Sequence, residues 1–356
     1  MWNSEIEIAG HKLKNRIMYP PLSSNWAEED GSAPDKLIEL YRGQAQGGVA
    51  AIVVEGTAIC QQGKGCSHSL MLTGEQHLAG FSALADAINA ENCFSAVQLM
   101  HAGGQANPER TGMQAVSPSG VECKAIEVQS RALSLDQVKT IRDQFIYSAE
   151  LAYRAGFKAV ELHLAHGYLL HEFLSQLKNK REDQYGGDTA GKLRLHLEII
   201  EGIRQRAPDL IVGVRVSGED YLTDGITQPR NAELLPILEQ AGVEYFSVTA
   251  GIYETAPTKH ERMAQGEFFS YAHGIKSIVS KPVVGVGKVL GIEQADQQLL
   301  AGNCDMVAIG RGLLADPHMV KRALQEENGK SGCIECHACM YLKYGRQYLR
   351  CPIRRI

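Results

Sequence analysis

The chain alternates between two hydrophobic patterns from one end to the other. Short apolar runs rich in β-branched residues, typical of buried strands, are followed by segments whose apolar positions recur at helical spacing. The helical spacing is clearest near residues 136–155, 190–206 and 292–301. The expected strands are Arg16–Pro20, Ala50–Glu55, Phe94–Leu99, Lys158–Leu164, Ile211–Val216, Tyr245–Val248, Pro282–Val286 and Met306–Ile309.

This alternation predicts an α/β fold, and specifically a single (β/α)8 TIM barrel with a short C-terminal cysteine-rich extension. A last helix is expected over Pro317–Glu326. We expect the barrel to occupy residues 1–328 and the extension to occupy residues 329–356. A doubly wound sheet is the alternative, but it usually carries a glycine fingerprint after its first strand, and residues 18–23 contain no glycine.

The expected C-terminal ends of the strands carry the polar features of the chain. Long insertions follow the third and fourth strands, over residues 100–134 and 167–189, and long loops at that end of a barrel usually shape a site. The fourth strand runs into His163, His166 and Tyr168. Three hydrogen-bonding groups at one strand end make an enzyme the leading hypothesis.

Side-chain alternation predicts which residues face the inside of the barrel. Alternate residues of a strand point to opposite faces. In four neighbouring strands one face stays apolar, while the other turns polar near the C-terminal end at Glu55, Gln98, His163 and Arg215. Buried polar groups need partners, so we expect these four to converge on a polar ligand at the barrel mouth. A self-satisfied polar network is the alternative.

Composition excludes several other classes. Hydrophobic residues make up 44% and charged residues 22%, which is ordinary for a globular protein, and the net charge of −5 argues against nucleic acid as a partner. The N-terminus lacks a signal-peptide pattern and no apolar run is long enough to cross a membrane. Nine cysteines without a secretory signal indicate thiols in a cytoplasmic protein.

Several short motifs follow one another in a specific order and spacing over residues 14–316, although each is weak alone. The motifs are Asn15-Arg16-Ile17, Glu55-Gly56-Thr57, Gln98-Leu99-Met100-His101, His163-Leu164-Ala165-His166-Gly167-Tyr168, residues 179–187, Val214-Arg215-Val216-Ser217 and Ile309-Gly310-Arg311. Together they resemble the Old Yellow Enzyme family of FMN-dependent ene-reductases, and most of all its branch of 2,4-dienoyl-CoA reductases.

The resemblance implies that FMN binds in the barrel mouth. It implies that Pro21, Leu22 and Ser23 run beside the flavin ring and that Gly56 permits its close approach. It also implies that Gln98 and Arg215 hydrogen-bond the pyrimidine edge, and a permanent guanidinium charge suits the anionic reduced flavin. A buried ion pair between Arg215 and either Glu55 or Glu161 is the alternative for this arginine.

A phosphate site is expected after the last two strands. Barrels commonly bind phosphate between these loops, and here they carry Gly287, Gly310 and Arg311. Glycines let backbone N–H groups approach an anion, and arginine binds phosphate with two parallel hydrogen bonds. The resemblance places the FMN phosphate at the same positions.

The resemblance gives His163, His166 and Tyr168 catalytic roles. The two histidines would bind the carbonyl oxygen of an enone or enoyl substrate and stabilise the developing enolate, and Tyr168 would donate the proton. His101 and His171 are expected to be structural. NADH or NADPH would reduce FMN, which would pass hydride to the β-carbon in a ping-pong cycle.

Two other function classes stay open. The chain could be an electron-transfer flavin subunit that relays electrons between a redox partner protein and FMN, or a non-flavin barrel such as an aldolase. We expect a homo-oligomer. Candidate acceptors include simple enones, dienoyl-CoA esters, and steroid or bile-acid enones.

Two departures from the family bear on specificity. Many relatives have His-x-Gly-Arg after the third strand, whereas this chain reads His101-Ala102-Gly103-Gly104 and therefore lacks one loop cation. Ser23 stands where some relatives have Cys or Thr beside the flavin, which affects its redox tuning.

Four cysteines near the C-terminus have ligand-like spacing. Three closely spaced thiols and a distant fourth suit a 4Fe–4S cluster or Zn, and the quartet resembles the cluster segment of the dienoyl-CoA reductase branch. We expect the FAD domain of those longer relatives to be absent here. A cluster fed by a partner protein, a structural metal knuckle and free thiols remain as interpretations. The quartet is Cys333, Cys336, Cys339 and Cys351, and the ordinary thiols are Cys60, Cys66, Cys93, Cys123 and Cys304.

Overall fold

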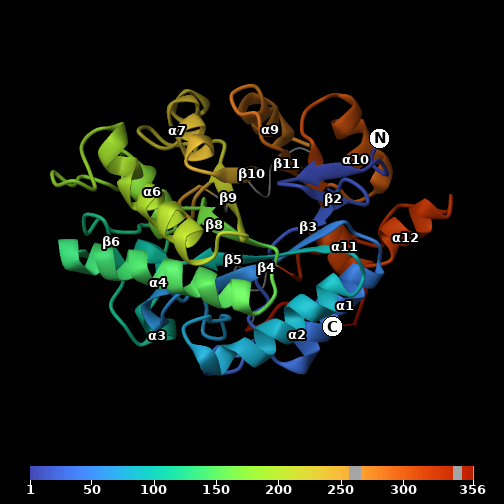
Figure 1. The fold of residues 1–356 in the computed structure, drawn as a ribbon, viewed down its shortest axis with the longest axis horizontal. Coiled ribbons are helices and arrows are strands. Elements are labelled where there is room, and N and C mark those ends of the chain that lie inside the picture. The colour runs from blue at the N-terminus through green and yellow to red at the C-terminus, as the bar shows by residue number, and fades with distance from the viewer. Residues whose placement is uncertain (256–265, 340–346, 356) are drawn as a thin grey trace.

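Eight parallel strands close into a barrel in the computed structural model, which describes residues 1–255, 266–339 and 347–355. Every expected strand is present with ends shifted by a few residues, which confirms the predicted (β/α)8 barrel (Figure 1). In order around the barrel the strands are β3 (Ile17–Tyr19), β4 (Ala51–Ala58), β5 (Phe94–Met100), β8 (Ala159–Leu164), β9 (Ile211–Ser217), β10 (Val243–Thr249), β11 (Val283–Val286) and β12 (Met306–Ala308).

Helices follow the strands and form the outer layer of Figure 1. The three helical segments with the clearest periodicity are confirmed as α4, α6 and α10. Helix α4 begins at a capping box in which the Ser134 hydroxyl accepts from the Gln137 amide. The helices are α1 (Asp35–Gln46), α2 (Leu78–Asn89), α4 (Leu135–Arg154), α5 (Leu169–Leu174), α6 (Thr189–Arg206), α7 (Gln228–Gln240), α9 (Phe269–Lys276), α10 (Ile292–Leu300), α11 (Arg311–Ala315) and α12 (Met319–Leu324).

The predicted alternation of the strands separates two apolar regions. Outward residues such as Val160 and Leu162 pack with the helices, while inward residues such as Ala159 form a separate cluster inside the barrel. The buried ring of Tyr245 fills this interior, where a Cβ on Gly213 would come within 2.1 Å of it. A glycine at this position of β9 therefore makes room for the aromatic ring.

A short antiparallel pair precedes the barrel and was not predicted. Strands β1 (Ile6–Ile8) and β2 (His11–Leu13) pair with each other. Ile8 and Leu13 are buried in the same cluster as Met18 and Val53, at the N-terminal end of the barrel strands. The pair closes the end of the barrel opposite the loops that follow the strands.

The insertions and the C-terminal extension gather around those loops. Residues 100–134 contain α3 (Pro108–Thr111) and the paired β6 (Val116–Ser117) and β7 (Arg131–Ala132). The extension is tied to the loop after β3, since the Leu349 amide donates to the Ser24 carbonyl at 2.9 Å. Among the described residues no helix combines the length and the apolar character that a membrane crossing requires.

Candidate active site

Strand register brings the predicted polar residues into neighbouring rows at the barrel mouth. Gln98 on β5 is level with Glu161 on β8, and the amide of Gln98 donates to the Glu161 carboxylate at 2.7 Å. His163 on β8 is level with Arg215 on β9, and Arg215 is level with Ser247 on β10. Four adjacent strands therefore present a continuous polar surface inside the barrel.

Glu55 departs from this arrangement. Its carboxylate accepts from the amide and the hydroxyl of Ser24, at 2.6 and 2.7 Å, and its own amide donates to the Tyr41 hydroxyl. The pairing of β4 with β5 shifts register between Val54 and Thr57, so simple alternation no longer fixes where Glu55 points. The expected convergence holds for Gln98, His163 and Arg215 but is wrong for Glu55.

The buried charge of Arg215 is balanced by Glu161 and not by Glu55. Burial lowers the pKa of Arg215, and the Glu161 carboxylate acts in the opposite direction. Burial also raises the pKa of Glu161, which Arg215 and the Gln98 hydrogen bond counteract. The Tyr245 hydroxyl interacts with the same carboxylate and also acts to lower its pKa. Among the described residues Nδ1 of His163 has no hydrogen-bond partner, so the polar surface is not fully self-satisfied.

His163, His166 and Tyr168 lie together, as the sequence predicted. Nε2 of His163 and Nδ1 of His166 are 3.3 Å apart, and the rings of His163 and Tyr168 are 4.9 Å apart. His166 has a φ of 63°, in the left-handed region that favours glycine, where the strand turns sharply towards α5. Two nitrogens this close can both reach a single substrate oxygen.

The groups around the two histidines determine which of their ring nitrogens carry protons. Burial, followed by the charges of Arg215 and His171, lowers the pKa of His163 well below its usual value, so the ring is neutral near pH 7. Nε2 of His166 lies 3.0 Å from the Thr249 hydroxyl. If Thr249 donates there, the ring proton of His166 sits on Nδ1, facing His163.

A cavity of about 300 Å³ opens at this mouth. It is within the size range of small-molecule and cofactor sites. Gly56 and Gln98 do not line it. The predicted cofactor residues that do line it are Pro21, Leu22, Ser23, Arg215, Gly287, Gly310 and Arg311.

Gly56 and Gln98 nevertheless form one surface. A Cβ on Gly56 would lie 3.4 Å from Oε1 of Gln98 and 2.5 Å from the sulfur of Met100. The Met100 sulfur thus occupies the space beside Gly56, and Gln98 is only 3% exposed.

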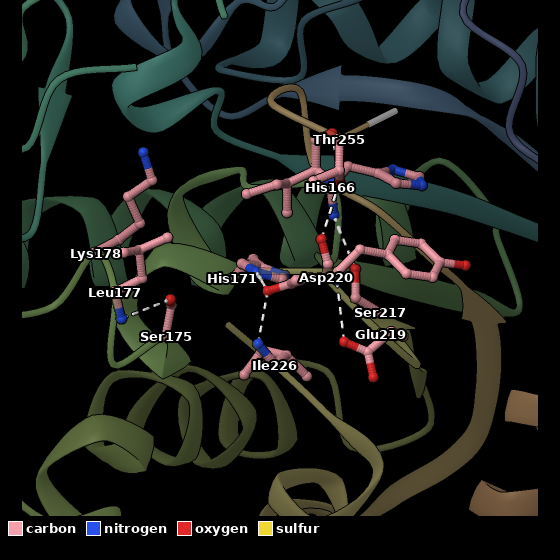
Figure 2. A network of polar contacts seen from close by, with 12 residues as sticks. His166, His171, Ser175, Leu177, Lys178, Ser217, Glu219, Asp220, Ile226 and Thr255 are labelled. Carbon is pink, nitrogen blue, oxygen red and sulfur yellow. Dashed lines mark hydrogen bonds and ion pairs between the residues drawn. The ribbon is translucent and has the colours of Figure 1, made fainter. Parts of the chain in front are cut away.

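The two histidines expected to be structural have internal partners. Nδ1 of His101 accepts from the Gly103 amide at 3.0 Å. Nε2 of His171 lies 3.0 Å from the Asp220 carboxylate, and both side chains are almost fully buried. Figure 2 shows this pair at the centre of a network that joins α5 to the loops after β9 and β10.

Two further residues at the mouth were missed by sequence reasoning. Thr249 lines the cavity, and the Tyr253 hydroxyl lies 3.0 Å from that of Tyr168. Thr249 and Tyr253 follow the expected strand Tyr245–Val248 closely. Both residues lie just after a barrel strand, where active-site residues of such barrels are found, and this position could have identified them from the sequence.

The C-terminal cysteines border one small space, but they do not form a ready metal site. Cys333, Cys336, Cys339 and Cys351 all line a cavity of about 20 Å³. Within the described part of the chain, no group of three or more Cys, His, Asp or Glu side chains is arranged to hold a metal ion. Residues 340–346, between Cys339 and Cys351, lie outside the described residues.

The fold and the site define a (β/α)8-barrel enzyme with a cofactor-sized cavity at the strand ends. The chain belongs to the NADH:flavin oxidoreductase / NADH oxidase family, whose model matches residues 4–329. This match confirms the predicted resemblance and the prediction of a flavin oxidoreductase.

Individual relatives agree with this assignment. An NADH oxidase of Thermoanaerobacter brockii is 38% identical over 94% of this chain and 52% of the relative. An NADPH dehydrogenase of Clostridium acetobutylicum is 32% identical over 89% of this chain and 92% of the relative. The chain thus spans about half the length of the first of these and nearly all of the second.

Solved structures show the same barrel. A 2-naphthoyl-CoA reductase in complex with 2-naphthoyl-CoA superposes with a TM-score of 0.92 and 26% identity, over 99% of this chain and 56% of that one. An Old Yellow Enzyme homologue from Zymomonas mobilis superposes with a TM-score of 0.77 at 21% identity, over 99% of this chain and 98% of that one. The second likeness concerns the fold alone.

Proposed function

We propose that the protein is an FMN-dependent ene-reductase that uses NADH or NADPH to reduce the C=C bond of an α,β-unsaturated carbonyl compound. The observation that carries the proposal is the grouping of His163, His166 and Tyr168 beside the cavity lined by Arg215 and Arg311. Reduction of such a compound needs hydrogen-bond donors for its carbonyl oxygen and a proton donor for its α-carbon.

The residues present fit FMN. When bound, FMN would accept hydride from the nicotinamide and return it to the β-carbon of the acceptor. Arg215 would stabilise negative charge on the reduced ring, and Gln98 would hold its edge. Arg311, with the backbone around Gly287 and Gly310, would bind the phosphate, and Pro21, Leu22 and Ser23 would border the ring.

The histidines and Tyr168 would act on the acceptor. When the carbonyl oxygen replaces the hydrogen bond between the two rings, Nδ1 of His166 and Nε2 of His163 would each carry a proton and donate to that oxygen, which draws electrons from the β-carbon. Tyr168 is protonated at neutral pH by its ordinary chemistry and would protonate the α-carbon. Hydride and proton together saturate the double bond, and the nicotinamide leaves oxidised. Both substrates need the same cavity, so the kinetics would be ping-pong.

Anaerobic stopped-flow spectroscopy of the FMN-loaded protein tests the proposal. NADH and NADPH are each mixed with the oxidised enzyme, and the reduced enzyme is then mixed with a panel of enones and enoyl esters. We expect fast flavin reduction by a nicotinamide and reoxidation by at least one unsaturated carbonyl. Tyr168→Phe is expected to slow only the second reaction, with Tyr153→Phe, an exposed tyrosine on α4, as the control.

Three results would count against the ene-reductase. Ordered ternary-complex kinetics would contradict shared occupancy of the cavity. Undiminished enone reduction by Tyr168→Phe would remove the proposed proton donor. A protein that binds no flavin would favour the non-flavin barrel.

A second candidate, a flavin subunit for electron transfer, is favoured by the position of the cysteines. Arg311, His337 and Cys339 line both the cofactor cavity and the small cysteine cavity, so the two sites share a wall. A 4Fe–4S cluster held by the four thiols would lie next to FMN, and Zn there would be structural. The thiols would have to close on the metal, because the described residues hold no ready site.

Metal analysis and direct reduction separate these candidates. About four irons per chain would indicate a filled cluster, and one Zn would indicate a structural knuckle. FMN that NAD(P)H reduces without any partner supports the ene-reductase. FMN that stays oxidised until a redox partner protein is added supports the electron-transfer subunit.

A further inference from the structure

A second tyrosine hydroxyl lies against the proposed proton donor. The hydroxyl oxygens of Tyr168 and Tyr253 are 3.0 Å apart, and their rings meet edge to face with centroids 5.8 Å apart. Tyr253 belongs to the loop after β10, 85 positions further along the chain. Two tyrosines from different strand ends therefore meet directly at the barrel mouth.

The loop that carries Tyr253 is tied to the segment that carries the histidines. Ile252 forms a bridge with His166, and its amide donates to the Thr255 hydroxyl at 3.1 Å. That hydroxyl in turn lies 3.0 Å from the Asp220 carbonyl oxygen. Asp220 is the partner of His171 in the network of Figure 2. The position of Tyr253 thus depends on the elements that also place the catalytic residues.

A buried ion pair holds the other side of the same loop. The Lys178 ammonium lies 2.8 Å from the Glu254 carboxylate, and their side chains are only 8% and 15% exposed. Lys178 also donates to the Glu122 carbonyl in the insertion after β5. Contacts on both flanks of Tyr253 therefore fix its hydroxyl opposite Tyr168.

We propose that Tyr253 is a positioning residue that stabilises Tyr168 while Tyr168 delivers its proton to the substrate. The inference rests on the proposed ene-reductase function. The Tyr168 O–H bond breaks as a C–H bond forms at the α-carbon, and the electron pair stays on the Tyr168 oxygen. Tyr253 donates a hydrogen bond to that oxygen, and a proton from water then restores Tyr168. No further oxidant or reductant is needed.

The surroundings keep Tyr253 in the donating state. Burial raises its pKa to about 12, whereas the hydrogen bond with Tyr168 and the charge of Arg110 act in the opposite direction. Tyr253 therefore carries its proton at neutral pH and can donate it in a hydrogen bond to the Tyr168 oxygen, 3.0 Å away. The titratable rings that face Tyr168 from its own segment are His163 and His166, with centroids 4.9 and 6.4 Å away.

The test separates this role from a merely structural one. Tyr253→Phe keeps the ring and its edge contact but removes the hydroxyl. With the FMN-loaded enzyme, we expect reoxidation by an enone to slow about 10- to 100-fold, which is the loss of one hydrogen bond to a charged group. Flavin reduction by NAD(P)H, and reoxidation by ferricyanide, which needs no proton on carbon, should stay unchanged.

Companion variants complete the design. Tyr153→Phe removes an exposed hydroxyl that lies 3.3 Å from Asp209, and should match the wild type in every reaction. Tyr168→Phe/Tyr253→Phe should be no slower with enones than Tyr168→Phe alone, because Tyr253 acts only through Tyr168. The alkaline limb of the pH profile of the enone reaction should move upwards in Tyr253→Phe.

A second readout needs no turnover. NMR of protein with ring-labelled tyrosine can follow the ionisation of Tyr168, whose signal is assigned by its loss in Tyr168→Phe. We expect that signal to titrate at higher pH in Tyr253→Phe than in the wild type, since the donor to the phenolate is gone.

Each outcome decides one question. An unchanged enone rate in Tyr253→Phe, or an equal fall in nicotinamide and enone reactions, would overturn the inference. So would an unmoved Tyr168 titration. If the wild-type enzyme reduces no enone at all, the proposed function fails instead, and the NMR titration alone then decides whether Tyr253 acts on Tyr168.

Discussion

The most demanding prediction concerns Asp220, which holds the network of Figure 2 together. Oδ2 of Asp220 lies 3.0 Å from Nε2 of His171 and accepts from the Ile226 amide at 2.7 Å. Both side chains of the pair are no more than 2% exposed. Asp220→Ala would leave Nε2 of His171 and the Ile226 amide without these hydrogen bonds in a region that solvent does not reach. Each buried donor that lacks an acceptor lowers the stability of the fold.

The size of the effect follows from general values. Breaking a buried pair by removing one partner costs about 3–5 kcal/mol. For a chain of 356 residues, an unfolding entropy of about 2.1 cal/mol/K per residue gives about 0.75 kcal/mol/K in total. We therefore expect the thermal midpoint of Asp220→Ala to fall by about 4–7 °C.

Thermal unfolding followed by circular dichroism provides the assay. Asp143→Ala is the matched control, because Asp143 is 60% exposed and pairs at the surface with Arg142. Loss of this surface ion pair should lower the free energy of unfolding by at most about 1 kcal/mol. The double variant His171→Leu/Asp220→Leu removes both polar groups, so its cost should be well below the sum of the single changes.

Two results would refute this reasoning. A midpoint for Asp220→Ala that matches Asp143→Ala would show that the buried pair contributes little. If the loss of unfolding free energy in the double variant equals the sum of the losses in the single variants, His171 and Asp220 act independently. Either result would also weaken the argument that this network positions the loop of Tyr253.

Three further predictions concern the cofactor site and pH. Arg311→Met should weaken FMN binding about 10- to 100-fold by removing a charge-assisted hydrogen bond, as measured by flavin fluorescence titration; unchanged affinity would place the phosphate elsewhere. Gly56→Ala should weaken retention of flavin on gel filtration, because the added Cβ would occupy the face where the ring is expected to approach; full retention would contradict a close approach of the ring to Gly56. Burial raises the pKa of Glu172 to about 8 from 4.5, so the stability that the protonated carboxyl contributes is present below about pH 4.5 and is lost as the pH rises through about 8. Glu172→Gln should therefore show a smaller fall in thermal midpoint between about pH 5 and about pH 9 than the wild type, and an equal fall would contradict the assignment.

The sequence predicted the barrel and much of its mouth because both follow from local periodicity. Strand alternation has a fixed period of two, so the inward-facing polar positions could be read directly. Parallel strands all end at the same rim, and this geometry alone is enough to place Gln98, His163 and Arg215 together. The motif His163–Tyr168 spans the end of β8 and the short turn after it, and so few intervening residues keep its members close.

Alternation failed where a local irregularity intervened. The register shift of β4 sends Glu55 to Ser24 instead of to Arg215, and the sequence carries no period that marks such a bulge. The β1–β2 pair was missed for a similar reason, because two strands of three residues each are too short to show a pattern.

By itself, the sequence determined the class of fold, the inward polar positions of β5, β8 and β9, and the identity of the groups after the fourth strand. Only the tertiary structure decided which loop residues meet them. Tyr253 reaches Tyr168 because Thr255, Glu254 and Ile252 are held by groups from three other segments. The shape of a loop depends on such long-range contacts, and no periodicity within the loop itself encodes them.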